Sequence, residues 1–240
     1  CFMTSTTAKH YDVIIIGGGP GGSQAGIVLA QAGKKVLILE REEYPRFHIG
    51  ESLLPATMPL FKETGFYDVL DSGNYIRKYG ARFIDYNNDD EVYFGFENGL
   101  NAEIPMAFEV ERALFDKDIL AFAVKHGAEL HQPETVLSVE VVPAGAMQDN
   151  ASGNDIGAFV KTNVAEYTCS YVMDVTGRDA LLGKRLTSRE TNKGLNNVAV
   201  FAHFEGVERY EGKAEGDITI GLLPNFRRCR RLFSAFRWRE

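Results

Sequence analysis

The chain has 240 residues, of which 45% are hydrophobic and 25% are charged, a balance typical of a globular protein with one or two domains. No stretch is apolar over the length of a membrane span, and no apolar targeting segment stands at the N-terminus. Cys1, Cys169 and Cys229 are scattered and odd in number, which argues against a metal site or a disulfide framework and favours a reducing cytoplasm.

Charge is distributed unevenly along the chain. The formal net charge is −7, yet the last fifteen residues hold six arginines against one acid, which leaves 20 basic and 32 acidic residues elsewhere. Such a cluster is compatible with a nucleic-acid or membrane patch, but matches of this kind carry a high false-positive risk. We instead expect residues 226–240 to be an atypical basic tail foreign to the fold, and Met3 to be the natural start. No nucleic-acid or membrane partner is therefore expected.

Residues 11–40 carry the most regular pattern. Tyr11–Ile16 predicts a short apolar strand, Gly17–Gly22 a glycine turn, and the apolar residues that follow keep helical spacing until Gly33 ends the helix. Val36–Leu39 predicts a second strand, with Glu40 directly behind it. This order of strand, turn, helix and strand is the start of a βαβ unit.

The glycines follow the spacing G-x-G-x-x-G between the strand and the helix. In that setting Gly17 permits a tight turn, Gly19 lets the backbone approach a pyrophosphate, and Gly22 lets the helix pack on the strand. Phosphates would then meet N–H groups at the positive end of the helix dipole. Glu40 can accept hydrogen bonds from ribose hydroxyls. The pattern predicts a dinucleotide site without choosing between NAD and FAD.

Later segments alternate between helical and strand patterns. Two helices are expected, at about 53–64, where Gly65 ends the helix, and across 110–127. The expected strands occupy residues 75–86, 91–97, 128–130, three pieces of 134–174 around the polar loop 144–155, 197–207 and 217–223. Because the α/β order comes first and antiparallel patterns follow, we predict a nucleotide domain interleaved with a second sheet.

Three further motifs occur in order along the chain: YPRFHIGESLLP, EVERALFDKDIL and DVTGRDALLG. The first of them follows neither a helical nor a strand period. With the glycine turn, they make the chain up to about Leu223 resemble the FAD-dependent monooxygenase superfamily, and within it the flavin-dependent halogenases and their geranylgeranyl-reductase-like relatives. The matching positions are a Gly-Glu-x-x-x-Pro core, a leading arginine and an Asp-x-x-Gly-Arg run, here Gly50, Glu51, Pro55, Arg112, Asp174, Gly177 and Arg178.

The resemblance implies that FAD is the cofactor and that the loop at residues 44–55 approaches it. It places Arg46 toward the FAD phosphates or ribitol, and an arginine suits a phosphate. It places Glu51 and Ser52 beside the isoalloxazine ring and the ribityl chain, and Arg112 on the flavin nucleotide.

Two residues of this loop have structural alternatives. Glu51 can be a charge favoured by a helix N-terminus, with Ser52 as the cap of that helix. His48 is expected to be a local hydrogen-bonding residue rather than a general base.

Lys78 is the predicted catalytic residue. The resemblance places an active-site lysine shortly after the Gly-Glu loop, in a Lys-x-x-Ala/Gly-x-Phe-like strand that Lys78, Gly80, Ala81 and Phe83 match. In the family, a hypohalous species reaches the substrate through this lysine, whose ammonium can donate a hydrogen bond to it or whose amine can be halogenated once burial adjusts its pKa. The alternative is a solvated strand lysine beside Arg77.

The predicted function is that of an FAD-dependent halogenase, which uses reduced flavin, O2 and halide to halogenate an electron-rich phenol or pyrrole, free or carrier-bound. A separate flavin reductase is expected to supply FADH2. The alternatives are a flavin hydroxylase, a geranylgeranyl-reductase-like oxidoreductase and an inactive FAD-binding fragment. The Trp-x-Trp-x-Ile-Pro motif of such halogenases is absent, since Trp238 is the single tryptophan, and so is the later Gly-Asp segment. The chain is therefore expected to be the N-terminal part of a longer enzyme.

The expected fold class is α/β: a Rossmann-like FAD-binding domain with an interleaved, incomplete antiparallel β-sheet substrate domain. We place the FAD-binding domain at residues 8–75 and 105–190 and the partial substrate-domain sheet at residues 76–104 and 191–225. The substrate, the halide and the oligomeric state are left open by these patterns.

Overall fold

The computed structural model describes residues 8–99, 103–143, 145–149, 153, 155–186, 201–202, 208, 210–222 and 232–235. The chain divides into two compact units. Unit 1 comprises residues 1–47 and 113–197, and unit 2 comprises residues 48–112 and 198–240. The domain bounds expected from the sequence stay a prediction.

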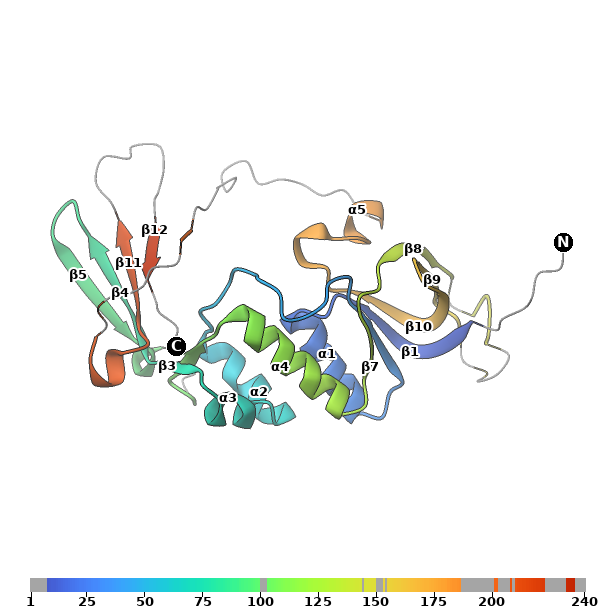
Figure 1. The fold of residues 1–240 in the computed structure, drawn as a ribbon, viewed down its shortest axis with the longest axis horizontal. Helices are drawn as coiled ribbons and strands as arrows, with labels where there is room; N and C mark the ends of the chain where they lie inside the picture. Colours follow the sequence, from blue (N-terminus) through green and yellow to red (C-terminus); the bar gives the residue numbers. More distant parts are fainter. Residues whose placement is uncertain are drawn as a thin grey trace. The chain divides into compact units, whose positions relative to one another are not determined.

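Unit 1 is built on a six-stranded sheet (Figure 1). Its strands in spatial order are β7 (Glu129–His131), β2 (Val36–Leu39), β1 (Lys9–Ile16), β10 (Glu166–Asp174), β9 (Ala158–Thr162) and β8 (Val136–Val141). The first four are parallel to one another, and the pairs β10–β9 and β9–β8 are antiparallel. The predicted α/β class and the βαβ start are confirmed, since β1 and β2 flank one helix and lie parallel.

Two helices cover one face of this sheet and lie side by side: α1 (Pro20–Gln31) and α4 (Arg112–Lys125) (Figure 1). Their close approach depends on Gly26, where an added Cβ would lie 2.7 Å from Ile38 Cδ1 and 3.7 Å from Ala123 Cβ. Strand β2 is buried along its whole length, as expected for an apolar strand with a parallel neighbour on each side. Each fully buried aliphatic side chain there contributes roughly 1.5–3 kcal/mol to the hydrophobic stabilisation.

Unit 2 contains a four-stranded sheet and a two-stranded sheet. The larger sheet has the order β12 (Leu232–Ala235), β11 (Ile218–Leu222), β4 (Gly80–Asp85), β5 (Asp90–Gly95), and the smaller one pairs β3 (Ile76–Lys78) with β6 (Ala107–Glu109). The pairs β4–β5 and β11–β12 are antiparallel, as expected, whereas β4 and β11 are parallel. Parallel pairing requires a long connection, and most of the chain lies between these two strands.

The short helical segments complete the described elements. Unit 2 has η1 (Pro55–Thr57), α2 (Met58–Thr64), α3 (Tyr67–Ser72), η2 (Phe96–Asn98) and η5 (Gly212–Ala214), and unit 1 has η3 (Gly177–Asp179) and α5 (Gly183–Leu186). The helix expected from residue 53 therefore begins at Pro55, because proline suits the first turn. It ends as predicted at Gly65, which has a φ of 84°.

The strand predicted across residues 75–86 is divided at Tyr79. Strand β3 pairs with β6, while β4 pairs with β5 and β11. The backbone N–H groups of Tyr79 and Gly80 both donate to Oδ1 of the buried Asp217, at 2.8 and 2.7 Å, and the Tyr93 hydroxyl donates to Oδ2 at 2.7 Å. Asp217 thus satisfies the two N–H groups that the change of partner strand takes out of the ladder.

Two sequence predictions cannot be compared with this fold. The strand predicted at 197–207 and the basic tail 226–240 lie outside the described residues, except for residues 201–202 and the backbone of β12.

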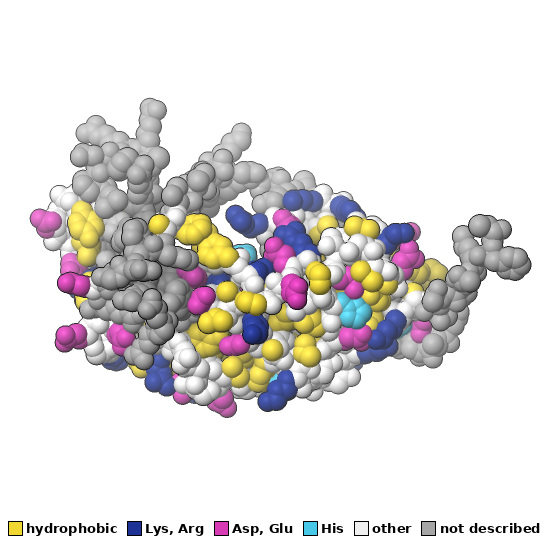
Figure 2. Space-filling view, viewed as in Figure 1, with side chains coloured by type: hydrophobic (Ala, Val, Ile, Leu, Met, Phe, Trp, Pro, Cys, Tyr) yellow, Lys and Arg dark blue, Asp and Glu magenta, His cyan; other side chains and the backbone are white. Residues whose placement is uncertain are grey.

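In the described part of the chain, no helix has the length and apolar character needed to cross a bilayer. The described residues also include no group of three His, Cys, Asp or Glu side chains placed to hold a metal ion. Figure 2 shows Lys and Arg side chains interspersed with Asp and Glu on the visible face.

Replacing Asp217 with alanine should destabilise unit 2. The substitution leaves two backbone N–H groups and a tyrosine hydroxyl without their buried acceptor, so we expect a loss of about 2–4 kcal/mol in the free energy of unfolding. Urea unfolding measures the loss, and hydrogen exchange should accelerate at the Tyr79 and Gly80 amides. Asp90→Ala, at an exposed position of β5, is the control and should change stability by less than about 0.5 kcal/mol. Equal effects of the two variants would contradict this account.

Candidate functional site

The turn between β1 and α1 requires glycine at two positions for reasons internal to unit 1. Gly17 has a φ of 107°, and an added Cβ would lie 2.6 Å from the Val175 carbonyl oxygen. A Cβ at Gly22 would overlap the carbonyl oxygen of Gly17. A side chain at either position would push apart β1, α1 or the segment after β10, so these two glycines are explained by packing.

Gly19 differs from these two glycines. It is the N-cap of α1 with a φ of −65°, an ordinary value for any residue, and an added Cβ would meet only Arg46 Nη2, at 3.8 Å. The described residues therefore leave space beside Gly19 that their own packing does not use. The N–H groups of the first turn of a helix have no intrahelical acceptor, and the helix dipole makes this end positive. The space fits an anionic group such as a pyrophosphate.

Glu40 lies at the end of β2 and is 5% exposed. Its Oε2 accepts hydrogen bonds from the Gly18 N–H at 2.7 Å and the Tyr44 hydroxyl at 3.2 Å, and its Oε1 accepts from the Glu42 N–H at 2.9 Å. Burial raises the pKa of Tyr44, which keeps its hydroxyl a donor. The carboxylate holds the glycine turn, and because a carboxylate has about four acceptor positions, one remains for the predicted ribose contact.

Arg46 is held by acidic side chains in the same unit. Its Nε lies 3.0 Å from Glu42 Oε2, its Nη1 lies 3.4 Å from Asp116 Oδ2, and its Nη2 donates to the Tyr44 hydroxyl at 2.9 Å. The guanidinium also stacks on the Tyr44 ring, 4.7 Å from its centroid. Asp116 is completely buried on α4, so the arginine is anchored from the helix side. Gly17, Gly19, Gly22, Glu40 and Arg46 are thus brought together in unit 1.

In unit 2, Arg112 fixes the backbone of the Gly-Glu loop. Its Nη1 donates to the Ile49 carbonyl at 2.7 Å and to the Gly50 carbonyl at 3.4 Å, and the Glu51 carbonyl accepts from the Val110 N–H at 2.7 Å. The exposed His48 bonds through Nδ1 to the Ile49 oxygen at 2.7 Å, so the expected local hydrogen bond is confirmed. The flavin contacts predicted for Arg112 and Glu51 stay predictions.

Ser52 does not cap a helix. The helical segment begins at Pro55, with Leu54 at its N-cap position, and the Ser52 hydroxyl donates to Glu109 Oε1 at 2.8 Å. The alternative that treated Ser52 as a cap is therefore wrong. A cap would accept a hydrogen bond from a helix N–H group, whereas here the Ser52 hydroxyl accepts from Lys78 Nζ and donates to the carboxylate of Glu109 on β6.

Lys78, at the end of β3, is 1% exposed, so the alternative of a solvated strand lysine is wrong. Its Nζ donates to Ser52 Oγ and to the Leu53 carbonyl, the latter at 2.6 Å, and lies 3.3 Å from Glu109 Oε1. The nitrogen also lies 5.4 Å from the centroid of the Phe96 ring. We name these residues, Ser52, Leu53, Lys78, Phe96 and Glu109, the lysine cluster.

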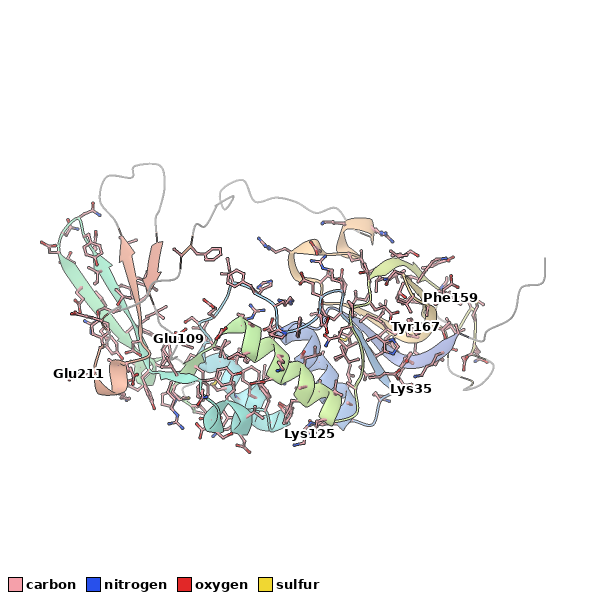
Figure 3. All side chains as sticks on the ribbon, in the orientation of Figure 1. Lys35, Glu109, Lys125, Phe159, Tyr167 and Glu211 are labelled. Atoms are coloured by element: carbon pink, nitrogen blue, oxygen red, sulfur yellow. The ribbon has the colours of Figure 1, made fainter. Side chains whose placement is uncertain are left out.

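Glu109 ends β6, shortly before α4 begins at Arg112 (Figure 3), and is 1% exposed. Burial raises the pKa of its carboxyl to about 7, even though Lys78 and Ser52 lower it. Burial likewise lowers the pKa of Lys78 from its ordinary value, while Glu109 and Asp217 raise it. Perturbed pairs of this kind are common at functional sites.

The Asp-x-x-Gly-Arg run forms a closed turn after β10. Asp174 Oδ1 accepts from the Thr176 N–H and hydroxyl, at 3.1 and 2.6 Å, and Oδ2 accepts from the Leu182 N–H at 2.7 Å. Gly177 has a φ of 62°, which favours glycine. In unit 1, this turn follows the Val175 carbonyl that faces Gly17.

The sequence patterns missed three buried acids: Glu109, Asp116 and Asp217. Each stands in or beside a predicted helix or strand, but the patterns assign none of them a role. The available signal was an acidic residue next to apolar ones, as in FEV and GDIT, since acids are rarely buried without a partner.

The chain is similar to proteins of known function. Residues 10–172 match the family described as FAD binding domain. The chain is 33% identical over 235 residues to the 1H-pyrrole-2-carbonyl-(peptidyl-carrier protein) chlorinase of Pseudomonas fluorescens, covering 89% of this chain and 51% of that protein. It is 30% identical over 207 residues to the corresponding brominase of Pseudoalteromonas luteoviolacea, covering 84% and 46%. The chain thus spans about half the length of these relatives.

Solved structures give the same similarity. The flavin-dependent brominase Bmp2 superposes with a TM-score of 0.68 at 28% identity, over 88% of this chain and 50% of that chain. CmlS, a flavin-dependent halogenase, superposes with a TM-score of 0.68 at 27% identity, over 89% and 38%.

Stability should depend on pH through Glu109. Its pKa is about 7 in the fold and 4.5 ordinarily, so the folded state binds more protons between these values. The resulting stabilisation is complete below pH 4.5 and is lost as the pH rises through 7. Relative to Glu109→Gln, the wild type should lose up to about 3 kcal/mol of unfolding free energy over this range. Urea unfolding at several pH values measures it, and parallel curves for the two proteins would contradict the burial argument.

Proposed function

The chain belongs to the FAD-binding-domain family, and on this premise we propose that it holds the nucleotide of FAD at the glycine turn of unit 1. The observation that carries this proposal is the unused space at Gly19 beside the start of α1. There the first-turn N–H groups and Arg46 would hold the pyrophosphate, and Glu40 would accept from a ribose hydroxyl. The flavin contacts of Glu51, Ser52 and Arg112 belong to the same proposal.

The reaction we propose is halogenation of an electron-rich aromatic ring, a phenol or a pyrrole. Relatives of this chain are named as a chlorinase and a brominase of a carrier-bound pyrrole, which supports such a substrate, free or on a carrier protein. Reduced FAD, when bound, supplies with oxygen the oxidising power that turns halide into hypohalous acid. The chain's own contribution at the reacting halogen is Lys78, held with its charge by the lysine cluster.

The reaction also requires a source of reduced flavin, and we propose a separate flavin reductase as that partner. A reducing cytoplasm is the compartment we infer, consistent with the buried, free thiol of Cys169.

Gly19→Val tests the cofactor assignment. The branched side chain would enter the space that the pyrophosphate needs, so bound flavin should be lost, measured by absorbance after gel filtration, while the circular dichroism spectrum stays that of the wild type. Gly22→Ala is the contrast: its Cβ overlaps the Gly17 carbonyl, so both folding and flavin should be lost. Normal flavin retention by a folded Gly19→Val protein would rule out the assignment.

Lys78→Met tests the halogenation. Methionine keeps most of the side-chain volume and removes the charge, so halogenated product should fall by at least about a hundredfold. FADH2 oxidation should stay nearly unchanged, because the lysine acts after oxygen has reacted. The measurement pairs oxygen uptake with product mass, in chloride and in bromide, on the complete product of the gene.

Arg77→Met is the matched control for this variant. Arg77 is next to Lys78 on the same strand, but its charge pairs with the exposed Asp71, so product formation should be retained. Persistent halogenation in Lys78→Met, or a joint collapse of flavin oxidation and halogenation, would make Lys78 a structural residue. A hydroxylated product from the wild type would favour the hydroxylase alternative.

A further inference from the structure

One side chain of unit 1 stands between the two charged residues of the nucleotide site. The Tyr44 hydroxyl lies 2.9 Å from Arg46 Nη2 and 3.2 Å from Glu40 Oε2. All three residues belong to unit 1. A single hydroxyl group thus separates the cation assigned to the pyrophosphate from the anion assigned to the ribose.

The chemistry of the partners fixes the direction of both hydrogen bonds of this hydroxyl. A guanidinium has no acceptor atom, and a carboxylate has no proton to donate. The hydroxyl must therefore accept from Arg46 and give its only proton to Glu40. Burial and the charge of Glu40 both raise the pKa of Tyr44, so the hydroxyl keeps the proton that this arrangement requires.

On the ribose side, the hydroxyl helps to set the orientation of the Glu40 carboxylate. Oε2 accepts from Tyr44 and, at 2.7 Å, from the Gly18 N–H, which uses both of its acceptor positions. Oε1 accepts from the Glu42 N–H at 2.9 Å and, among the described residues, has one position left. Oε1 is therefore the oxygen available to a ribose hydroxyl.

On the phosphate side, the same contact uses one of the two hydrogens of Arg46 Nη2. The Nε and Nη1 atoms face the carboxylates of Glu42 and Asp116, at 3.0 and 3.4 Å. Nη2 is also the atom nearest to a Cβ placed at Gly19, at 3.8 Å, so it borders the space assigned to the pyrophosphate. Its second hydrogen is left for an anion in that space.

Removing the hydroxyl alone would leave these opposite charges facing each other. Tyr44 and Glu40 are both buried, and opposite charges attract each other more strongly away from water. A direct ion pair of Arg46 with Glu40 would occupy the arginine that a phosphate needs and the carboxylate that a ribose needs. The guanidinium stacks on the Tyr44 ring, 4.7 Å from its centroid. A phenylalanine ring would keep this stacking, so its effect would isolate the hydroxyl.

We propose that Tyr44 is a positioning residue whose hydroxyl keeps Arg46 and Glu40 from pairing with each other, so that the arginine stays available to the pyrophosphate and the carboxylate to the ribose. The inference rests on the proposed nucleotide site and adds the residue that holds its two charges apart. It implies that Glu40 competes with a phosphate for Arg46 once the hydroxyl is gone.

A double-mutant cycle on the 240-residue chain tests this role, with inorganic pyrophosphate as the ligand and calorimetry as the measurement. Tyr44→Phe should weaken pyrophosphate binding by at least about fivefold, because Arg46 turns to Glu40. Adding Glu40→Gln should strengthen binding at least about fivefold more in the Tyr44→Phe background than in the wild type. The comparison of the two backgrounds cancels the general gain from removing a negative charge near an anion. Equal gains in the two backgrounds, or undiminished binding by Tyr44→Phe, would overturn the proposal.

Tyr171→Phe is the matched control for the loss of a hydroxyl. Tyr171 lies on β10 in the same unit and is 72% exposed, so its substitution should change pyrophosphate affinity by less than about twofold. ADP is the second ligand. Because ADP also needs the carboxylate of Glu40, Tyr44→Phe should weaken ADP binding by at least about tenfold, and by more than it weakens pyrophosphate binding. An ADP loss smaller than the pyrophosphate loss would contradict the role at the ribose.

Tyr44→Leu covers the case in which Tyr44→Phe does not fold. It also lacks the hydroxyl, so Glu40→Gln should again strengthen pyrophosphate binding more than it does in the wild type, and the absence of this difference would overturn the proposal. If the wild type binds neither pyrophosphate nor ADP, the proposed nucleotide site fails, and the inference fails with it. If the wild type binds both and the cycle shows no coupling, only the role of Tyr44 fails.

Discussion

The organisation of the polar parts of this protein depends on one constraint, the cost of removing a carboxylate from water. Glu40, Glu109, Asp116 and Asp217 are all buried, and a buried ion must be met by hydrogen-bond donors or by an opposite charge. Each of them meets this demand with a different part of the chain. Glu40 holds the glycine turn, Asp116 holds Arg46, Glu109 holds Lys78, and Asp217 holds the point where the strand changes partner.

This constraint separates residues that serve packing from residues that leave room for a ligand. Gly17 and Gly22 have no space for a side chain, whereas Gly19 has space that no described residue of unit 1 occupies. Likewise, the donors of Lys78 are all used within unit 2, which makes the lysine a held charge and not a mobile one. The carboxylates take part in both places, since Glu40 accepts from the Gly18 N–H in the turn and Glu109 pairs with the lysine.

Much of the local structure followed from sequence patterns. The strand, turn, helix and strand at residues 11–40 were predicted, and the family match confirms the expected FAD-binding fold. The observed ends of helices and strands differed from the predicted ends where the local pattern contained no signal for an end. Residues 75–86 alternate like one strand, yet they form two strands. The division falls where the N–H groups of Tyr79 and Gly80 donate hydrogen bonds to Asp217. Ser52 resembled a helix cap because its partner, Glu109, is 57 positions away.

The sequence by itself determined most of the helix and strand segments, although not α3 or β6, and it determined where the glycine turn stands and which lysine to suspect. These are short-range properties, because periodicity and turn chemistry act over a few residues. Only the tertiary structure decided which of the three glycines is left open and which acid faces Lys78. It alone also paired β4 with β11 in parallel. Asp217 meets Tyr79 across 138 positions. Burial and charge pairing depend on such distant contacts, and no local pattern in the chain records them.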